Sequence, residues 1–354
     1  MIPDTPVPGH DPGADDLARG AAPGLPMALV ERWRAGGRTV ADARRVLGVH
    51  VTTGYSVVSD SAGLTRLSRS LGLLEVLAII DGPKRLLHAY GRAAGGRAVG
   101  VWAADNAQMF HPASIGADVL LSALLRTQDE IARRCRVRIG VGVHHGSFYD
   151  LDGGLYGAEA DSVEILAENH TEGGEIAVTE AVTERLPAGH SFVLRRKGVP
   201  GAPSGPLRTV YRVLDGPRAA AAEAASGDGA SGEGARYPIP YSAAFYKDLL
   251  RLERDPEDAG LAATLAGRHL RERTVVLAER GEADAGAGDE DGGSEAAILR
   301  ELDLSVSMRE TGLRLLPPVG AVKVAGPLGI YLFDEPAAAA RFARDLRPPW
   351  PRPG

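Results

Sequence analysis

The order of elements expected in residues 50–215 predicts an α+β fold of the ferredoxin-like type, with helices covering one face of a mainly antiparallel sheet. Short apolar stretches separated by turns rich in Gly are typical of strands. Two longer stretches, with apolar residues three and four positions apart, are typical of helices. Together they give the order strand, helix, strand, strand, helix, strand.

Each element of this core follows from a local pattern. The expected elements are a strand at 50–59, a helical region at 64–90, a hairpin of 98–104 and 107–110, a helix at 112–134, strands at 137–144 and 147–151, a helix at 157–169, a strand at 175–179, a helix at 180–186, and strands at 192–196 and 209–214. We expect Asp81-Gly-Pro to interrupt the first helix, because Pro lacks a backbone N–H.

Composition narrows the possible partners. The chain has 354 residues and a net charge of −6, and its basic residues are scattered, so we expect no binding to nucleic acid. It has one cysteine, Cys135, which favours a protein of the reducing cytoplasm. The longest apolar stretch, 71–80, is too short to span a membrane, and the first residues do not resemble a signal peptide.

Changes in composition along the chain predict five segments. They are a disordered tail at 1–26, N-terminal helices at 27–49, a first domain at 50–215, a flexible linker at 216–236 and a second domain at 237–347. The second domain is expected to contain helices at 241–252 and 260–270, a strand at 274–278, an acidic loop at 281–294, a helix at 296–312, a hairpin of 320–325 and 328–333, and a helix at 336–346.

One stretch in the first domain suggests a binding site for a metal and a phosphate. The expected strand ends at a carboxylate, Asp60, and is followed by a turn of small residues and the start of a helix. A carboxylate is a hard oxygen ligand for a divalent cation, and backbone N–H groups of such a turn bind anions. The candidate nucleotide-binding residues of the turn are Ser61, Ala62, Gly63, Leu64 and Thr65. Alternatively, Asp60 only caps an ordinary helix.

Four further motifs follow this stretch in a definite order. They are Val99–Phe110 with Asp105, Arg138–Gly146, Gly154–Gly157 and Gly174–Val182. In order and spacing, the five motifs resemble the catalytic domain of class III nucleotidyl (adenylate/guanylate) cyclases, over about residues 52–214.

The resemblance implies a cyclase-type fold and a chemistry. In that family two Mg²⁺ or Mn²⁺ ions, held by two aspartates, assist the attack of the ribose 3′-hydroxyl on the α-phosphate of a nucleoside triphosphate. Asp60 and Asp105 match those two positions. The family's sites form across a dimer interface, so the resemblance implies a homodimer or an intramolecular pseudo-dimer.

Other family positions have changed here. Val101 stands where the family has a base-reading Lys, and the second base-reading position falls near Gly154. Asp161 and Ile165 stand where the family has an Asn that orients the ribose and an Arg that stabilises the transition state. Loss of one such electrostatic group typically slows a reaction by about a hundredfold to a thousandfold.

The second domain, 237–347, resembles a divergent and truncated copy of the first domain. Thr274–Gly281 repeats the strand and turn around Asp60, with Glu279 near the place of the acid. Gly320–Phe333 repeats the hairpin around Asp105, with Pro327 in place of the acid and Lys323 at the family's Lys position.

These observations favour a degenerate cyclase-like module that binds a nucleoside triphosphate and serves signal transduction. An alternative is a divergent active enzyme that makes a cyclic nucleotide and pyrophosphate, completed by Lys323 or by a partner chain. A third is an interaction domain without a ligand. Whether the chain is an enzyme stays open at this point.

Overall fold

The computed structural model describes residues 25–100, 102, 105–151, 154–200, 205–220, 239, 241–256, 258–279, 294–315, 321–325 and 328–346. Residues 281–293 of the predicted acidic loop, most of the predicted tail and most of the predicted linker lie outside these residues. The chain divides into two compact units. The central unit comprises His50–Pro240 and Ala244–Ala262, and the flanking unit comprises Met1–Val49, Tyr241–Ala243 and Ala263–Gly354.

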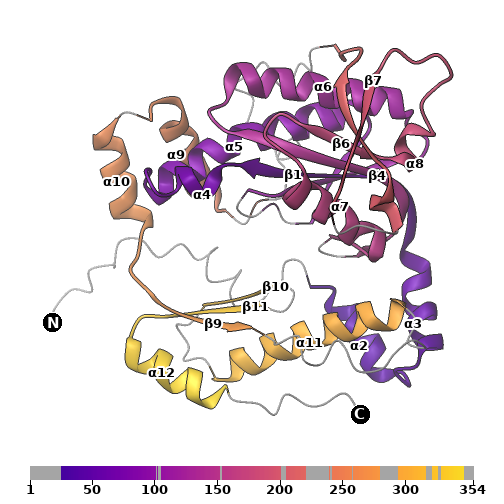
Figure 1. Cartoon of the computed structure of the whole chain (residues 1–354). Coiled ribbons are helices and arrows are strands. Elements are labelled where there is room, and N and C mark those ends of the chain that lie inside the picture. Colours follow the sequence, from indigo (N-terminus) through magenta and orange to yellow (C-terminus); the bar gives the residue numbers. More distant parts are fainter. Residues whose placement is uncertain are drawn as a thin grey trace. The chain divides into compact units, whose positions relative to one another are not determined.

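The core of the central unit has the predicted ferredoxin-like topology. Its elements are β1 (Val51–Ala62), α5 (Leu73–Ala93), β2 (Arg97–Val99), β3 (Ala107–Pro112), α6 (Ala117–Arg134) and β4 (Arg138–Leu151). The strands pair in the order β2-β3-β1-β4, and every pair among them is antiparallel. This is the βαββαβ arrangement, so the predicted fold class is confirmed (Figure 1).

The sheet continues beyond β4 and is covered on both faces. The further elements are β5 (Gly154–Tyr156), α7 (Ala158–His170), β6 (Ile176–Thr179), α8 (Glu180–Thr183), β7 (Val193–Lys197) and β8 (Val210–Asp215), followed by α9 (Ala243–Arg254). The division between the two units falls within α10 (Ala259–His269), after Ala262. Neighbouring residues of β1 point to opposite faces. Val57 packs in the main core with residues of α5 and α6, whereas Val58 packs against Val163 and Ala167 of α7.

Two expectations about these elements were wrong. The helix does not break at Asp81-Gly-Pro, because α5 runs through Pro83 and buries most of its residues, which offsets the lost hydrogen bond. The break lies earlier instead, after the single turn α4 (Leu64–Leu67). The expected strands 137–144 and 147–151 form one strand, β4, in which Gly146 pairs with Gly54 of β1 rather than turning the chain.

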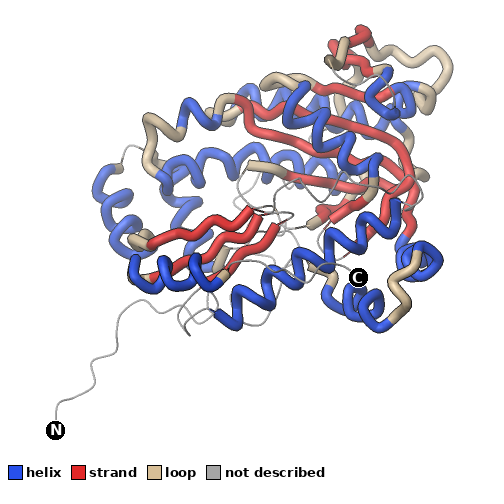
Figure 2. Tube along the Cα trace, turned by 60° about the horizontal axis from the view of Figure 1, so that its bottom comes forward, coloured by secondary structure: helices blue, strands red, loops and turns tan. Residues whose placement is uncertain are grey.

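The flanking unit contains a second, partial copy of the same core. Its sheet consists of β9 (Thr274–Glu279), β10 (Ala321–Ala325) and β11 (Leu328–Phe333), and its helices are α2 (Met27–Ala35), α3 (Val40–Leu47), α11 (Ser294–Leu315) and α12 (Pro336–Asp345). The strand order β10-β11-β9 repeats β2-β3-β1. Among the described residues, no strand stands in the place of β4. Helices α11 and α12 lie on one face of this sheet (Figure 2).

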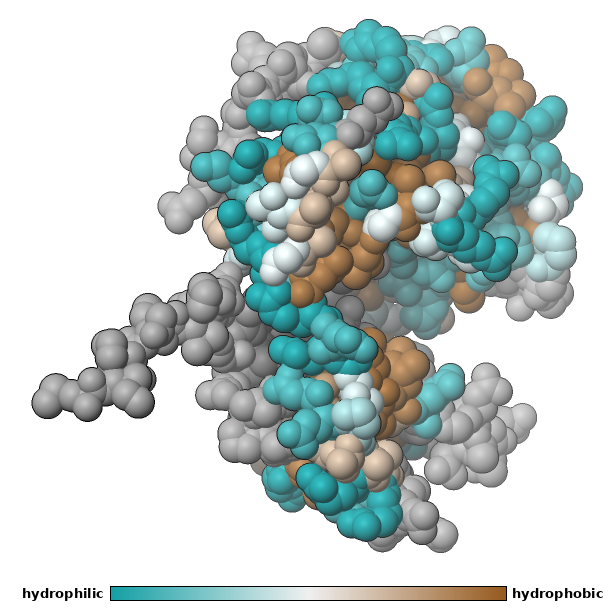
Figure 3. Space-filling view, turned by 90° about the vertical axis from the view of Figure 1, so that its left-hand side faces the viewer, coloured by the Kyte–Doolittle hydropathy of each residue, from teal (hydrophilic) through white to brown (hydrophobic). Residues whose placement is uncertain are grey.

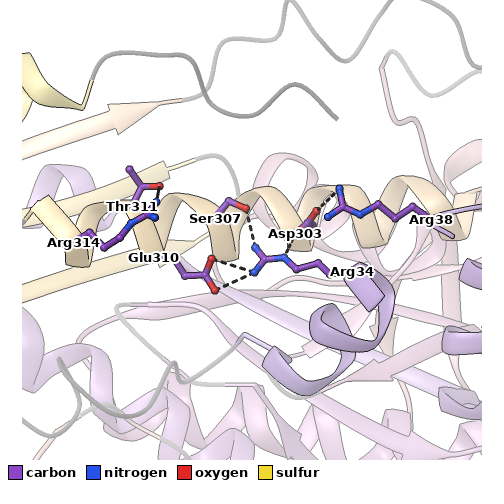
Figure 4. A network of polar contacts seen from close by, with 7 residues as sticks. All are labelled: Arg34, Arg38, Asp303, Ser307, Glu310, Thr311 and Arg314. Atoms are coloured by element: carbon purple, nitrogen blue, oxygen red, sulfur yellow. Dashed lines mark hydrogen bonds and ion pairs between the residues drawn. The ribbon is translucent and has the colours of Figure 1, made fainter. Parts of the chain in front are cut away.

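The N-terminal helices belong to the flanking unit, because α2 and α3 pack on α11. The guanidinium group of Arg34 joins them (Figure 4). It donates to Asp303 Oδ1 at 2.5 Å, to Ser307 Oγ at 2.8 Å and to both carboxylate oxygens of Glu310 at 3.0 and 3.1 Å. The side chain of Trp33 is buried beside it. The segment that precedes β1 is therefore bound to a helix near the other end of the chain.

No helix among the described residues is long and apolar enough to cross a membrane. On the face shown in Figure 3, hydrophobic residues gather in separate patches between hydrophilic ones. Exposed apolar side chains include Val275 and Leu277 of β9 in the flanking unit and Leu73 of α5 in the central unit.

Candidate metal and nucleotide site

A cavity of about 620 Å³ lies at the carboxyl end of β1. The end of β1, the turn before α4, the tip of the β2–β3 hairpin and the end of α7 all contribute to it. Its lining residues are Asp60, Ser61, Ala62, Gly63, Leu64, Thr65, Ser68, Val76, Asp105, Glu168, Thr171, Glu172 and Gly173. The structure thus brings the predicted acid, the predicted turn and the predicted hairpin tip to one place.

The carboxylates of Asp60 and Asp105 meet in this cavity. Burial, and then the charge of Asp105, raise the pKa of the Asp60 carboxyl to about 6, and the two side chains are within hydrogen-bonding reach of each other. The backbone N–H of Ser61 acts in the opposite direction by donating to Asp60. Two repelling carboxylates that are partly removed from water favour a cation between them.

The hairpin tip that carries Asp105 is held by Trp102. Its indole Nε1–H donates to the backbone oxygens of Val99, at 3.1 Å, and Gln108, at 3.0 Å, and so closes the chain across the tip. The indole is buried and packs nearly perpendicular to the ring of His88 on α5, with 5.8 Å between the ring centroids. Next to Asp105, the Asn106 amide donates to Glu168 Oε1 at 2.8 Å. The tip is therefore tied to α5 and α7.

The turn after Asp60 offers polar groups to a ligand. Ser61 is buried, and among the described residues its hydroxyl has no hydrogen-bond partner. A buried polar atom left unpaired is costly unless a ligand or water completes it. Gly63 has a φ of 73°, which a residue with a side chain rarely adopts, and it lets the chain turn sharply beside the carboxylate.

The charge of the cavity suits a cation better than a bare anion. Four carboxylates line it, those of Asp60, Asp105, Glu168 and Glu172, and no Lys or Arg is among the described lining residues. Oxygen ligands of this kind fit Mg²⁺ or Mn²⁺, which proteins often hold with one or two carboxylates plus phosphate or water oxygens. The described residues contain no group of three or more ligating side chains placed around one point, so bound phosphate or water would complete the coordination.

Other predicted site residues lie elsewhere. Asp161 and Ile165 are one turn apart on α7, exposed, and on the face away from the sheet. Lys323 belongs to the flanking unit, where β10 pairs it with Ile330 of β11. Gly154 is in β5, opposite Leu151. Val101 lies outside the described residues, as does Pro327.

Sequence reasoning missed one charged residue near the acids. Lys84 of α5 is only 3% exposed, and burial lowers the pKa of its ammonium group to about 8, although the charges of Asp81 and Asp105 oppose this shift. Its spacing was the available signal: Lys84 comes four residues after Ile80 and three before Leu87, on the apolar face of the helix, where a charge requires a partner.

Comparisons with known proteins show that the fold of this chain is similar to that of solved structures. No protein-family model matches the sequence, and no curated protein matches it. Matching structures include the adenylyl cyclase CyaB from P. aeruginosa, at 19% identity over 48% of this chain and 99% of that chain, with a TM-score of 0.40. They also include the guanylate cyclase domain of RhGC from Catenaria anguillulae in complex with GTP, at 15% identity, 46% and 97% coverage and a TM-score of 0.39.

The guanylyl cyclase Cya2 is similar at 16% identity, with 46% of this chain and 92% of that chain covered and a TM-score of 0.38. The structural neighbours are thus class III adenylyl and guanylyl cyclase catalytic domains, the family that the order of the motifs resembles. The likeness covers about half of this chain.

Proposed function

We propose that the central unit is a cyclase-homology module that binds a nucleoside triphosphate together with Mg²⁺ or Mn²⁺ and serves signalling through this binding. The observation that carries the proposal is the meeting of Asp60 and Asp105 at one cavity, beside a turn with an unpaired buried hydroxyl. A divalent ion at these carboxylates neutralises the charge of the triphosphate when it is bound.

The residues around the acids support binding in distinct ways. Asp60 and Asp105 hold the cation, and the Ser61 hydroxyl is placed to donate to a phosphate oxygen. The N–H groups of Leu64 and Thr65 begin α4, where they have no acceptor within the helix. Without the cation, the acidic lining repels a polyphosphate, so we expect binding to depend strictly on the metal.

The same residues argue against rapid cyclisation. In the family that this chain resembles, the positions of Asp161 and Ile165 supply groups that stabilise the transition state across a dimer interface. Here they supply a carboxylate and a hydrocarbon, both exposed on the outer face of α7. We propose that a second unit faces them, either from another copy of the chain or from the flanking unit with Lys323, without restoring the missing guanidinium.

The proposal is tested by incubating the full chain with each of the four nucleoside triphosphates and Mn²⁺. Binding is followed by equilibrium dialysis, and cyclic product and pyrophosphate are measured by mass spectrometry. We expect metal-dependent binding with little or no product. Asp60→Asn should abolish that binding, whereas the matched control Asp255→Asn, an exposed acid on the loop after α9, should not change it.

Rapid release of a cyclic product would identify an active cyclase instead, completed by Lys323 or a partner chain. Absence of metal-dependent binding would leave a ligand-free interaction domain. The double variant Asp161→Asn with Ile165→Arg restores the family's pair, so it should raise cyclisation if a second unit faces α7. Unchanged activity of that variant would contradict the facing arrangement.

A further inference from the structure

Strand β9 is an edge strand, although its counterpart in the central unit is paired on both sides. In the flanking sheet β9 pairs with β11, and among the described residues no strand pairs with its other edge (Figure 1). The corresponding strand of the central unit, β1, pairs with β4 along all of its twelve residues. Every second residue of β9 therefore directs its backbone N–H and C=O away from β11, toward a place that a further strand can take.

The side chains of β9 do not protect this edge. Exposed edges of natural sheets are usually protected by Pro, by a bulge or by a charge within the strand. The sequence of β9 is Thr-Val-Val-Leu-Ala-Glu, so its charged residue, Glu279, stands at the very end. Val276 packs against the buried cluster that includes Phe342 of α12, whereas Val275 and Leu277 are 50% and 64% exposed. A strand of this composition favours pairing with another strand.

We propose that β9 pairs with β9 of a second copy of this chain, antiparallel and around a twofold axis at Val276, so that the two flanking sheets join into one. This inference is independent of the proposed function, because it concerns the flanking unit alone. Opposite residues of an antiparallel pair point to the same face, so a twofold axis between identical strands passes through a residue that faces itself. With Val276 at the axis, Val275 of one copy lies opposite Leu277 of the other, and each covers apolar surface of the other.

The charges at the two ends of β9 select this register. Arg273, directly before the strand, and Glu279 are each three residues from Val276 (276 minus 273, and 279 minus 276). Arg273 of each copy therefore lies opposite Glu279 of the other, and opposite charges across a strand pair stabilise it. An axis at Val275 would instead place Arg273 opposite Leu277, and an axis at Leu277 would place Glu279 opposite Val275. The axis at Val276 matches both the charges and the apolar side chains.

The ion pair that Arg273 makes within the chain is compatible with this contact. Arg273 Nη1 lies 2.8 Å from Asp334 Oδ1, and the arginine side chain is still 42% exposed. A guanidinium group carries five N–H donors, so it can bind a second carboxylate. Glu279 is exposed as well, and both charges are accessible to a second copy.

Sedimentation equilibrium of the full chain over a range of concentrations, without metal or nucleotide, tests the pairing. We expect the native chain to associate to twice its mass of 37.0 kDa. Arg273→Glu and Glu279→Arg each place like charges opposite one another at two positions of the dimer, so each variant alone should have a dissociation constant at least about tenfold higher. An equimolar mixture of the two variants restores opposite charges at both positions and should associate like the native chain.

Arg45→Glu on α3 is the matched control, because it also removes an arginine from an exposed ion pair and changes the net charge equally. It should leave the association unchanged. If a single variant does not fold, the double variant Arg273→Glu with Glu279→Arg decides, since it restores both pairs and should dimerise like the native chain.

A native chain that stays monomeric would overturn the inference. So would a dimer that persists in both single variants, because the two copies would then be joined elsewhere. Both results would leave the proposed function standing, whereas a native chain that dimerises through β9 without binding metal and nucleotide would overturn the proposed function alone.

Discussion

Asp60→Asn should stabilise the metal-free protein at neutral pH while destroying its response to metal. In the folded chain the pKa of Asp60 is about 6, against 3.8 for the free side chain, so the folded state disfavours the ionised form. A difference of about two pKa units corresponds to at most about 3 kcal/mol, at about 1.4 kcal/mol per unit. Asp60 is partly exposed, and solvent reduces this limit, so we expect a gain of about 1–2 kcal/mol in the free energy of unfolding.

The sign of the pH dependence follows from the raised pKa. Below about pH 4 the carboxyl is protonated in both the folded and the unfolded chain, so the substitution gains nothing there. As the pH rises through 6, the native protein loses stability relative to the variant, and the difference is complete above about pH 7. Urea denaturation of both proteins at intervals between pH 4 and pH 8, without metal, measures this difference.

The same variant should lose the stabilisation that Mn²⁺ gives the native chain. A ligand at a hundred times its dissociation constant adds about 2.7 kcal/mol to the free energy of unfolding. Melting curves with and without Mn²⁺ therefore separate the two effects. Equal stability of the two proteins at every pH, or an undiminished response of the variant to Mn²⁺, would refute the reasoning that Asp60 and Asp105 form a repelling, cation-binding pair.

Two further predictions concern packing and the N-terminal helices. Gly54→Ala should destabilise the central unit by about 1–3 kcal/mol in urea denaturation, because a Cβ there would lie 2.2 Å from the backbone oxygen of His111, whereas Gly48→Ala, with open space around it, should change little. Arg34→Ala should destabilise the flanking unit by about 1–3 kcal/mol, because Glu310 loses its contacts with Arg34 and Asp303 keeps the longer contact of 3.7 Å with Arg38, while Arg45→Ala, at an exposed ion pair, should cost under about 0.5 kcal/mol. Equal effects of the two substitutions in either pair would contradict the packing or the ion-pair argument.

The order of elements was predictable from local pattern, whereas the meeting of Asp60 and Asp105 was expected from the resemblance to the cyclase family. A carboxylate at the end of a strand and another at a hairpin tip meet wherever the hairpin lies beside that strand, and the antiparallel pairing of β1 with β3 brings this about. The turn residues 61–65 line the cavity for the same reason, since they directly follow Asp60.

Local sequence pattern gave wrong or no predictions for features that depend on contacts between residues far apart in the sequence. Pro83 is a strong signal for the end of a helix, yet α5 continues through it because the surrounding core buries that turn. The burial of Lys84 could not be read from one segment, because it depends on what packs against α5. The attachment of α2 and α3 to α11 joins residues far apart in the sequence, and no local signal points to that partner.

The flanking unit consists of chain segments that precede and follow the central unit in the sequence, and this order has a consequence for synthesis. Arg34 precedes its partner Asp303 by 269 positions, so α2 emerges from the ribosome long before the helix that will cover it. Residues 50–215 are complete at that time and fold first, as domains generally do in the order of translation. During that interval Leu29, Val30 and Trp33 lack their final neighbours, and we expect a nascent chain stalled before α11 to be bound by chaperones through this segment.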